Sequence, residues 1–252
     1  GVPQVTGDKL PEAFKRQCLH GYYAAISYVD AQVGRLMAAL DETGLAKNTI
    51  IVFSADSGVA RGSHGLIGKQ NVYEHSMRVP LIIAGPGIAE NKRSNAMCYL
   101  FDVLPTLGKL CGVSGPKTSE GIDFSATLND STKPARSQLM FAYRNVQRAF
   151  TDGRWKLIRY PQVDRTQLFD LQADKLELNN LADQPEQAAK VAEMMTRLAK
   201  EQQKYGDTSP SFTVTRFSPC SREYTFPSTS KTADRSDISR IWCMSNVEAQ
   251  NP

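Results

Sequence analysis

The residues whose types could do chemistry gather in one Gly-rich stretch, residues 54–78. Asp56 and Ser57 offer oxygen ligands to a hard metal cation, although a serine hydroxyl is the weaker donor. Lys69 offers an ammonium group that suits an oxyanion, and His64 could contact a substrate or transfer a proton. The glycines between them let the backbone approach a small ligand closely. The stretch therefore predicts a site that combines a metal with an oxyanion.

Each of these residue types also has an ordinary structural role. An aspartate after a strand can cap the loop, and a loop lysine is usually solvated. Arg78 follows Glu74 by four residues, which favours an ion pair between them if the turn is helical. His75, between the two, is typical of a structural hydrogen-bonding residue. The elements that hold the stretch must decide between these interpretations.

A short apolar run precedes the stretch and should position it. Residues 50–53 are continuously apolar and largely β-branched, which indicates a strand buried on both faces, hence a central parallel strand. Its carboxyl end would deliver Asp56 and Ser57 to the edge where open α/β sheets place their ligands. Residues 79–84 are a second candidate for a buried strand, closed by Gly-Pro-Gly.

Longer patterns predict the elements around these strands. Apolar residues recur with a helical period over residues 11–43, which predicts a long helix that covers one face of the sheet, and residues 100–111 predict an amphipathic helix. Four later segments are typical of short strands: residues 139–143, 146–150, 155–160 and 168–171. Asp152 and Gly153 signal a tight hairpin among them. A final helix over residues 185–205 should pack on this small antiparallel sheet.

These elements predict an α/β fold with a mainly parallel sheet, followed by a small antiparallel sheet subdomain with a helix. The expected boundaries are residues 1–138 for the α/β core and 139–206 for the subdomain. Residues 207–252 are rich in Ser and Thr and lack any period, which predicts a disordered or loosely attached tail.

In chain order, the motifs resemble the sulfatase family of the alkaline-phosphatase-like superfamily, and especially its choline-sulfatase and iduronate-sulfatase relatives. The shared features are a strand followed by D-S-G, where the family has D-(N/H)-G, then G-S-H-G, G-K, Y-E-H-S-M-R-V-P-L and G-P-G. The long helix, F-D-V-L-P-T-L, and R-W-K-L-I-R-Y with Q-L-F-D-L also match. The resemblance spans about residues 19–205 and implies the C-terminal portion of a sulfatase core.

The resemblance implies a role for each candidate residue. Asp56 matches a calcium ligand, and Ser57 stands where the family usually places a second ligand to the metal. Lys69 matches the lysine that contacts the sulfate, so that it counts as both a catalytic and a substrate-binding candidate. His64 is expected to contact the substrate, because the family takes its general-acid histidine from an upstream segment. The implied reaction is hydrolysis of a small-molecule or carbohydrate sulfate ester.

The nucleophile of the family does not occur in the expected place. Sulfatases oxidise a cysteine or serine in C/S-x-P/A-x-R to formylglycine, and residues 1–45 lack that motif. Residues 218–222, S-P-C-S-R, imitate it without the helix that should follow, which indicates coincidence. We therefore expect formylglycine upstream of this chain. A phosphonate or phosphate ester hydrolase of the same superfamily, or a non-catalytic binding or structural remnant, are the alternatives.

The composition argues against several other classes of protein. The net charge of +4 is mild and the basic residues are scattered, which does not favour nucleic-acid binding. The five cysteines are odd in number and form no C-x-x-C pair, so neither a disulfide framework nor a cysteine metal site is expected. No apolar run reaches the length of a membrane span. The family suggests a periplasmic or extracellular location, and the sequence does not address oligomeric state.

Overall fold

The structure is a computed structural model that describes residues 11–209 and 243–249. Its helices are α1 (Glu12–Glu42), α2 (Glu74–Met77), α3 (Val103–Leu110), α4 (Ser125–Asn129) and α5 (Ala188–Lys204). Its strands are β1 (Ile51–Ser54), β2 (Ala60–Arg61), β3 (Ile67–Gly68), β4 (Leu81–Ala84), β5 (Lys92–Tyr99), β6 (Leu139–Tyr143), β7 (Gln147–Thr151), β8 (Trp155–Tyr160), β9 (Arg165–Asp170) and β10 (Cys243–Ala249). Short 3-10 turns cover Ala46–Asn48, Ser63–Gly65, Leu100–Asp102, Pro161–Val163 and Pro185–Gln187. The α/β class is confirmed.

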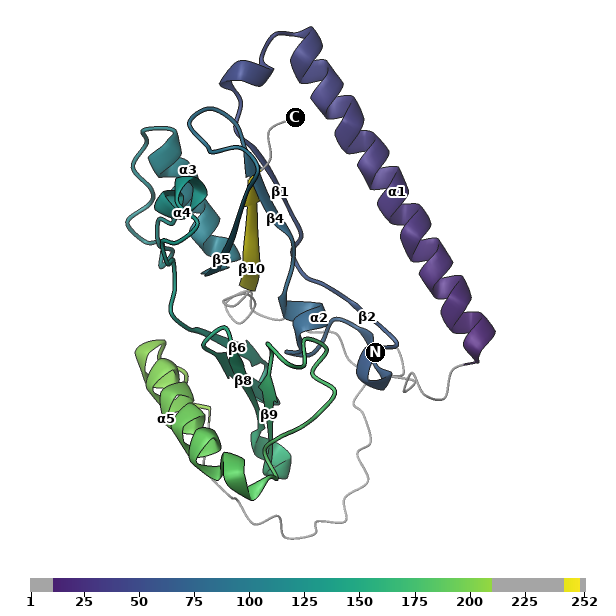
Figure 1. The fold of residues 1–252 in the computed structure, drawn as a ribbon, viewed down its shortest axis with the longest axis vertical. Coiled ribbons are helices and arrows are strands. Elements are labelled where there is room, and N and C mark those ends of the chain that lie inside the picture. Colours follow the sequence, from purple (N-terminus) through teal and green to yellow (C-terminus); the bar gives the residue numbers. More distant parts are fainter. Residues whose placement is uncertain (1–10, 210–242, 250–252) are drawn as a thin grey trace, which may run out of the picture.

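The first sheet has the strand order β1-β4-β10-β5 (Figure 1). β1 and β4 pair antiparallel, with Ile51 opposite Ala84 and Ser54 opposite Leu81. The prediction that β1 is a parallel strand buried on both faces is therefore wrong: β10 alone pairs in parallel in the described sheet, with β4, and Phe53 is 39% exposed. The physical reason is the route of the chain, which forms residues 54–78, here called the site loop and including α2, at one end of the sheet and returns beside β1. A continuous apolar run specifies a strand but not the direction of its partner.

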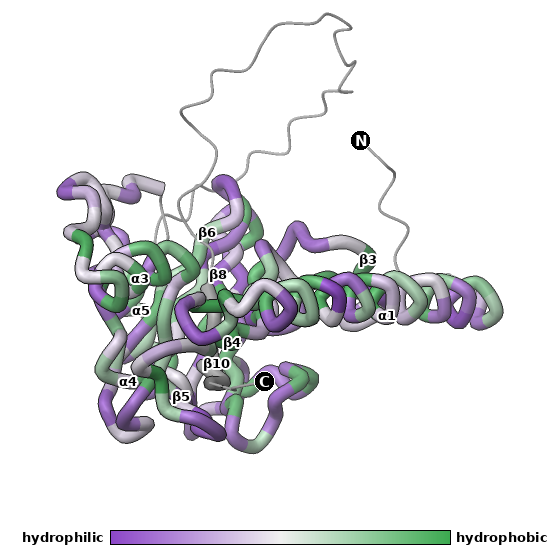
Figure 2. Tube along the Cα trace, turned by 90° about the horizontal axis from the view of Figure 1, so that it is seen from above, coloured by the Kyte–Doolittle hydropathy of each residue, from purple (hydrophilic) through white to green (hydrophobic). Residues whose placement is uncertain are grey.

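Helix α1 forms where the period predicted it, but it does not cover the sheet closely. None of its residues is buried, and Figure 2 shows that it extends past the rest of the molecule. An apolar groove of about 590 Å³ separates it from the sheet, with Ile26, Val29 and Val33 on one side and Phe53 and Ile82 on the other. Helical periodicity identifies an apolar face without specifying what packs on it, so the predicted covering of the sheet is corrected.

The second sheet confirms the predicted antiparallel subdomain. Its order is β6-β7-β8-β9, every neighbouring pair is antiparallel, and Gly153 adopts a φ of 92° in the hairpin between β7 and β8. Helix α5 packs on one face of this sheet (Figure 1), where Met194 and Leu198 join a buried cluster with Phe150 and Leu157.

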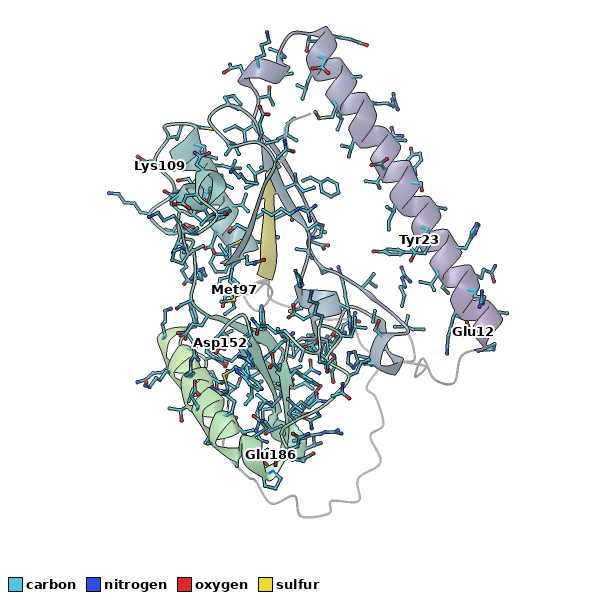
Figure 3. The ribbon with its side chains drawn as sticks, viewed as in Figure 1. Glu12, Tyr23, Met97, Lys109, Asp152 and Glu186 are labelled. Atoms are coloured by element: carbon cyan, nitrogen blue, oxygen red, sulfur yellow. The ribbon has the colours of Figure 1, made fainter. Side chains whose placement is uncertain are left out.

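The two sheets meet through a second buried cluster. Met97 and Tyr99 of β5 pack there against Leu139 and Phe141 of β6, together with Tyr73 from the site loop. A side chain at position 153 would contact the Met97 sulfur at 3.3 Å, which shows how closely the hairpin approaches β5; Figure 3 labels Met97 and the adjacent Asp152 at this junction. The subdomain is therefore packed onto the core beside the site loop.

The tail prediction is wrong for part of its range. β10 pairs with both β4 and β5, and Asp207 accepts hydrogen bonds from Arg148 at 2.5 and 3.0 Å. β10 pairs with strands that lie about 140 to 170 residues earlier in the chain, which leaves no local signal in the sequence. β5 and α4 were likewise not predicted. Residues 218–222 lie outside the described residues. None of the described helices combines the length and apolarity needed to cross a membrane.

Candidate active site

The end of β1 brings the two principal candidate residues together. The Lys69 ammonium lies 3.2 Å from Asp56 Oδ2, although the two residues are thirteen positions apart. The hydrogen bond from Lys69 is the main reason that the pKa of Asp56 lies below its ordinary value, with the charge of Lys69 adding to the effect. Ser57 donates from its hydroxyl to Asp56 Oδ1 at 3.4 Å. A carboxylate, a hydroxyl and an ammonium group therefore lie together at the end of β1, where Asp56 and Lys69 are exposed and Ser57 is half-buried.

Gly58 fixes the corner on which this group stands. Its N–H donates to the Ser76 carbonyl of α2 at 3.0 Å. A Cβ at position 58 would lie 2.0 Å from the His75 carbonyl oxygen, far inside van der Waals contact. The glycine after Asp56 and Ser57 is therefore required by the close approach of α2.

His64 lies against the C-terminal subdomain. Its backbone is left-handed, with φ of 55°, and its Nε2 lies 3.0 Å from the Leu176 carbonyl oxygen. Its ring stacks on Tyr73 with centroids 4.0 Å apart and planes within 7°. These contacts anchor His64 from two sides, and contact with a substrate stays a prediction.

His75 is the second histidine of the site loop. Its Nε2 is buried and has no hydrogen-bond partner in the described part of the chain, in contrast to the expected structural role. Its pKa is lowered to about 4, mainly by burial, and the charges of the nearby His64 and Lys156 contribute while Glu74 opposes them. The imidazole is therefore neutral at physiological pH.

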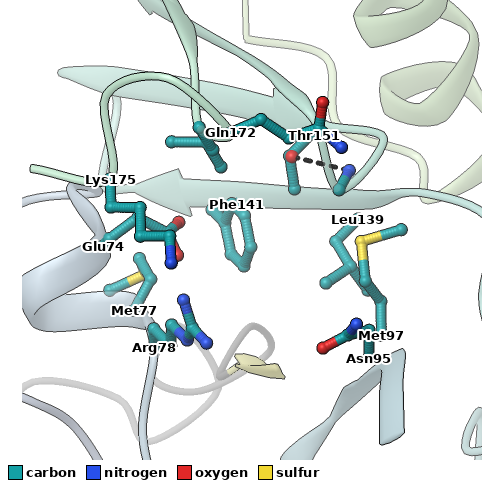
Figure 4. A pocket seen from close by; sticks show the side chains of 12 residues that line it. Glu74, Met77, Arg78, Asn95, Met97, Leu139, Phe141, Thr151, Gln172 and Lys175 are labelled. Atoms are coloured by element: carbon teal, nitrogen blue, oxygen red, sulfur yellow. Dashed lines mark hydrogen bonds between the residues drawn. The ribbon is translucent and has the colours of Figure 1, made fainter. Parts of the chain in front are cut away.

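The expected ion pair between Glu74 and Arg78 does not form. Glu74 instead pairs with Lys156 of β8, whose Nζ lies 2.7 Å from Oε1. Arg78 lines a pocket of about 420 Å³ between α2 and the second sheet, and Lys175 lies at the same pocket (Figure 4). The helical turn is too short to direct the pairing, because α2 ends at Met77.

The donor set at Asp56 can be compared with the calcium ion that the resemblance implies. A carboxylate and a hydroxyl are hard oxygen donors and suit calcium, which takes about six to eight oxygen ligands. No group of three or more His, Cys, Asp or Glu residues with metal-site geometry occurs among the described residues. Asp56 and Ser57 therefore fit calcium as contributors to a site rather than as a complete site.

The sequence did not identify three residues that hold the site loop: Tyr73, Lys156 and Glu177. Tyr73 donates from its hydroxyl to Gln167 at 2.8 Å, and the buried Lys156 pairs with Glu177 at 2.9 Å as well as with Glu74. The available signal was a lysine inside the apolar run of β8. Its partners lie far away in the sequence, so the run alone could not identify them.

The sequence matches two family profiles that together cover most of the described chain. Residues 62–204 match "N-sulphoglucosamine sulphohydrolase, C-terminal", and residues 4–113 match "Sulfatase". The choline-sulfatase of Rhizobium meliloti is 39% identical over 177 residues, which is 68% of this chain and 34% of the relative. The N-acetylglucosamine-6-O-sulfatase of Bacteroides thetaiotaomicron is 33% identical over 208 residues, 77% of this chain and 37% of the relative.

Solved structures give the same result. A structure described as a complex with its substrate D-glucosamine-2-N,6-O-disulfate superposes with a TM-score of 0.68 at 27% identity, over 82% of this chain and 45% of the other. A putative sulfatase from Bacteroides thetaiotaomicron gives a TM-score of 0.70 at 28% identity, over 78% and 45%. The chain spans about a third of the length of the curated relatives it matches. The profile matches show that the chain belongs to the sulfatase family.

Proposed function

We propose that the full natural protein containing this chain hydrolyses a sulfate monoester at the site formed by Asp56 and Lys69. The observation that carries this proposal is the ion pair of 3.2 Å between them, at the end of a strand and within residues 4–113, which match the sulfatase profile. An exposed ammonium beside an ionised carboxylate supplies a point charge for an oxyanion next to an oxygen ligand for a cation.

Lys69 would bind a sulfate oxygen and stabilise the negative charge that grows in the transition state. Asp56 and Ser57 would provide part of a calcium site, and calcium, when bound, neutralises negative charge on the sulfate group. The hydrogen bond from Lys69 lowers the pKa of Asp56, which favours the ionised form that a cation binds. His64, held by Leu176 and Tyr73, would contact the sulfate or the leaving group.

The substrate class in this proposal is a sulfated sugar or another small sulfate ester. It is supported by the relatives, since one is named for N-acetylglucosamine-6-O-sulfate and one structure holds a disulfated glucosamine. Action in the periplasm or outside the cell belongs to the same proposal and rests on the family resemblance. Cell fractionation with an antibody against the protein would test it.

Two rival functions remain as alternatives. Phosphonate monoester hydrolases share the fold, and the one from Silicibacter pomeroyi superposes with a TM-score of 0.60 at 24% identity, which supports the architecture alone. A non-catalytic binding role is favoured by Ser57, because a serine replaces a stronger metal ligand of the family.

The decisive assay compares two esters of 4-nitrophenol on the full natural protein, with and without a calcium chelator. We expect kcat/KM for the sulfate ester to exceed that for the phenylphosphonate ester and to fall on chelation. Faster hydrolysis of the phosphonate would favour the first rival. Absence of turnover of either ester by protein shown to carry formylglycine would favour the non-catalytic reading.

A further inference from the structure

A fully buried lysine connects the second sheet to the site loop. Lys156 lies on β8, and its side chain is 0% exposed. Its Nζ lies 2.7 Å from Glu74 Oε1 at the start of α2 and 2.9 Å from Glu177 Oε1 in the loop after β9. Burial alone would lower the pKa of Lys156, but the two carboxylates raise it above its ordinary value, so the ammonium stays charged. Removing it would leave two carboxylates without their shared cation.

Glu177 holds α2 with its second oxygen. Glu177 Oε2 accepts a hydrogen bond from the backbone N–H of Glu74 at 2.6 Å. Glu177 is itself buried and adopts a left-handed φ of 56°, a conformation that non-glycine residues rarely take. A single carboxylate thus joins the lysine of the second sheet to the first residue of the turn.

Two routes lead from this ionic cluster, formed by Lys156, Glu74 and Glu177, to the candidate site. In the first, α2 accepts the hydrogen bond from Gly58 through the Ser76 carbonyl, and Gly58 directly follows Asp56 and Ser57. In the second, the residue before Glu177 places its carbonyl 3.0 Å from His64 Nε2. Gly58 and His64 therefore both contact segments that the ionic cluster holds.

We propose that Lys156 is a positioning residue for the site, which acts by holding α2 and the Leu176–Glu177 segment so that the Asp56–Gly58 corner and His64 keep their arrangement. The role of that corner in catalysis rests on the proposed sulfatase function. The positioning itself does not, because it follows from the contacts alone. An ordinary buried ion pair would stabilise the whole fold without a preference for the site loop.

Hydrogen exchange of the Gly58 amide distinguishes these two roles, because this amide reports the contact between the corner and α2. Lys156→Met is compared with Leu157→Ala, a neighbour on β8 whose side chain packs toward α5 instead. The temperature is adjusted so that both variants have the same global stability. We expect exchange at Gly58 to rise at least about tenfold in Lys156→Met relative to Leu157→Ala, the scale of losing a charged hydrogen bond, with β7 amides equally protected in both.

Glu177→Gln is the second variant and decides the question if Lys156→Met does not fold. It keeps an oxygen for the Glu74 N–H but loses the charge that faces Lys156. Faster exchange at Gly58 with unchanged exchange in β7 supports positioning. Equal exchange at Gly58 in the folded variants, or parallel increases in the loop and the sheet, overturns it. An effect on exchange in a protein that hydrolyses no sulfate ester would retain the positioning and reject the function.

Discussion

Asp102 is the best test of how polar contacts hold the core together. Its side chain is 0% exposed, and it accepts hydrogen bonds from Arg136 Nε and Nη2 at 2.7 and 2.6 Å. It also accepts from the backbone N–H groups of Tyr99 at 2.7 Å and Ile122 at 2.8 Å. One carboxylate therefore joins the end of β5, the loop before α4 and the connection to the second sheet.

Replacement of Asp102 by alanine should be strongly destabilising. Removing one partner of a buried ion pair costs about 3–5 kcal/mol, and each buried N–H without an acceptor costs about 1–3 kcal/mol. Arg136 keeps some compensation, because it stacks over the Tyr99 ring at 4.8 Å and remains 11% exposed. We therefore expect a loss of about 4 kcal/mol in the free energy of unfolding, a large share of the ~5–15 kcal/mol typical of a domain.

Urea unfolding followed by circular dichroism measures this loss, with Asp130→Ala as the control. Asp130 accepts hydrogen bonds from Thr132 and lies 4.0 Å from Lys133 Nζ, both near neighbours in the chain, and 47% of its side chain is exposed. The control should lose less than about 1 kcal/mol. A loss for Asp102→Ala as small as that of the control would refute the assignment of Asp102 as a structural centre.

Three further predictions follow from single residues. Burial lowers the pKa of His75 to about 4, so stability should be full above the unfolded pKa near 6.5 and fall as pH drops from there toward 4; melting curves should show a weaker fall for His75→Leu. Gly58→Ala should lower the free energy of unfolding in urea by more than about 1 kcal/mol, because the added Cβ would lie 2.0 Å from the His75 carbonyl oxygen. Gly21→Ala, in the exposed helix α1, should instead raise that free energy by about 0.5–1 kcal/mol. Burial raises the pKa of Cys98 to about 12, so peptide mapping after iodoacetamide should find the exposed Cys111 labelled before Cys98; equal labelling of these two would contradict the structure.

The sequence predicted those features that depend on neighbours in the chain. The hairpin at Asp152 and Gly153 forms because the two residues set the turn themselves, and the second sheet followed from it. The sequence predicted one site for Asp56 and Lys69 because Asp56 follows the end of a strand and a Gly-rich loop connects it to Lys69.

Features that depend on distant partners could not be predicted in this way. β10 completes the first sheet from a segment whose local sequence lacks any strand period. The role of Lys156 could not be identified because its partners, Glu74 and Glu177, lie 82 and 21 residues away in the chain. The direction of β1 against β4 likewise depends on the path of the intervening loop and not on the composition of either strand.

The measurement that tests the central claim most directly is kcat/KM for 4-nitrophenyl sulfate in the Lys69→Ala variant of the full natural protein. Lys47→Ala, in the exposed turn before β1, is the matched control. We predict a decrease of about 10²-fold or more for Lys69→Ala, the scale of removing one transition-state contact, and an unchanged value for the control. A Lys69→Ala variant as active as the wild type would contradict the assignment of the Asp56–Lys69 pair as the sulfate-binding site.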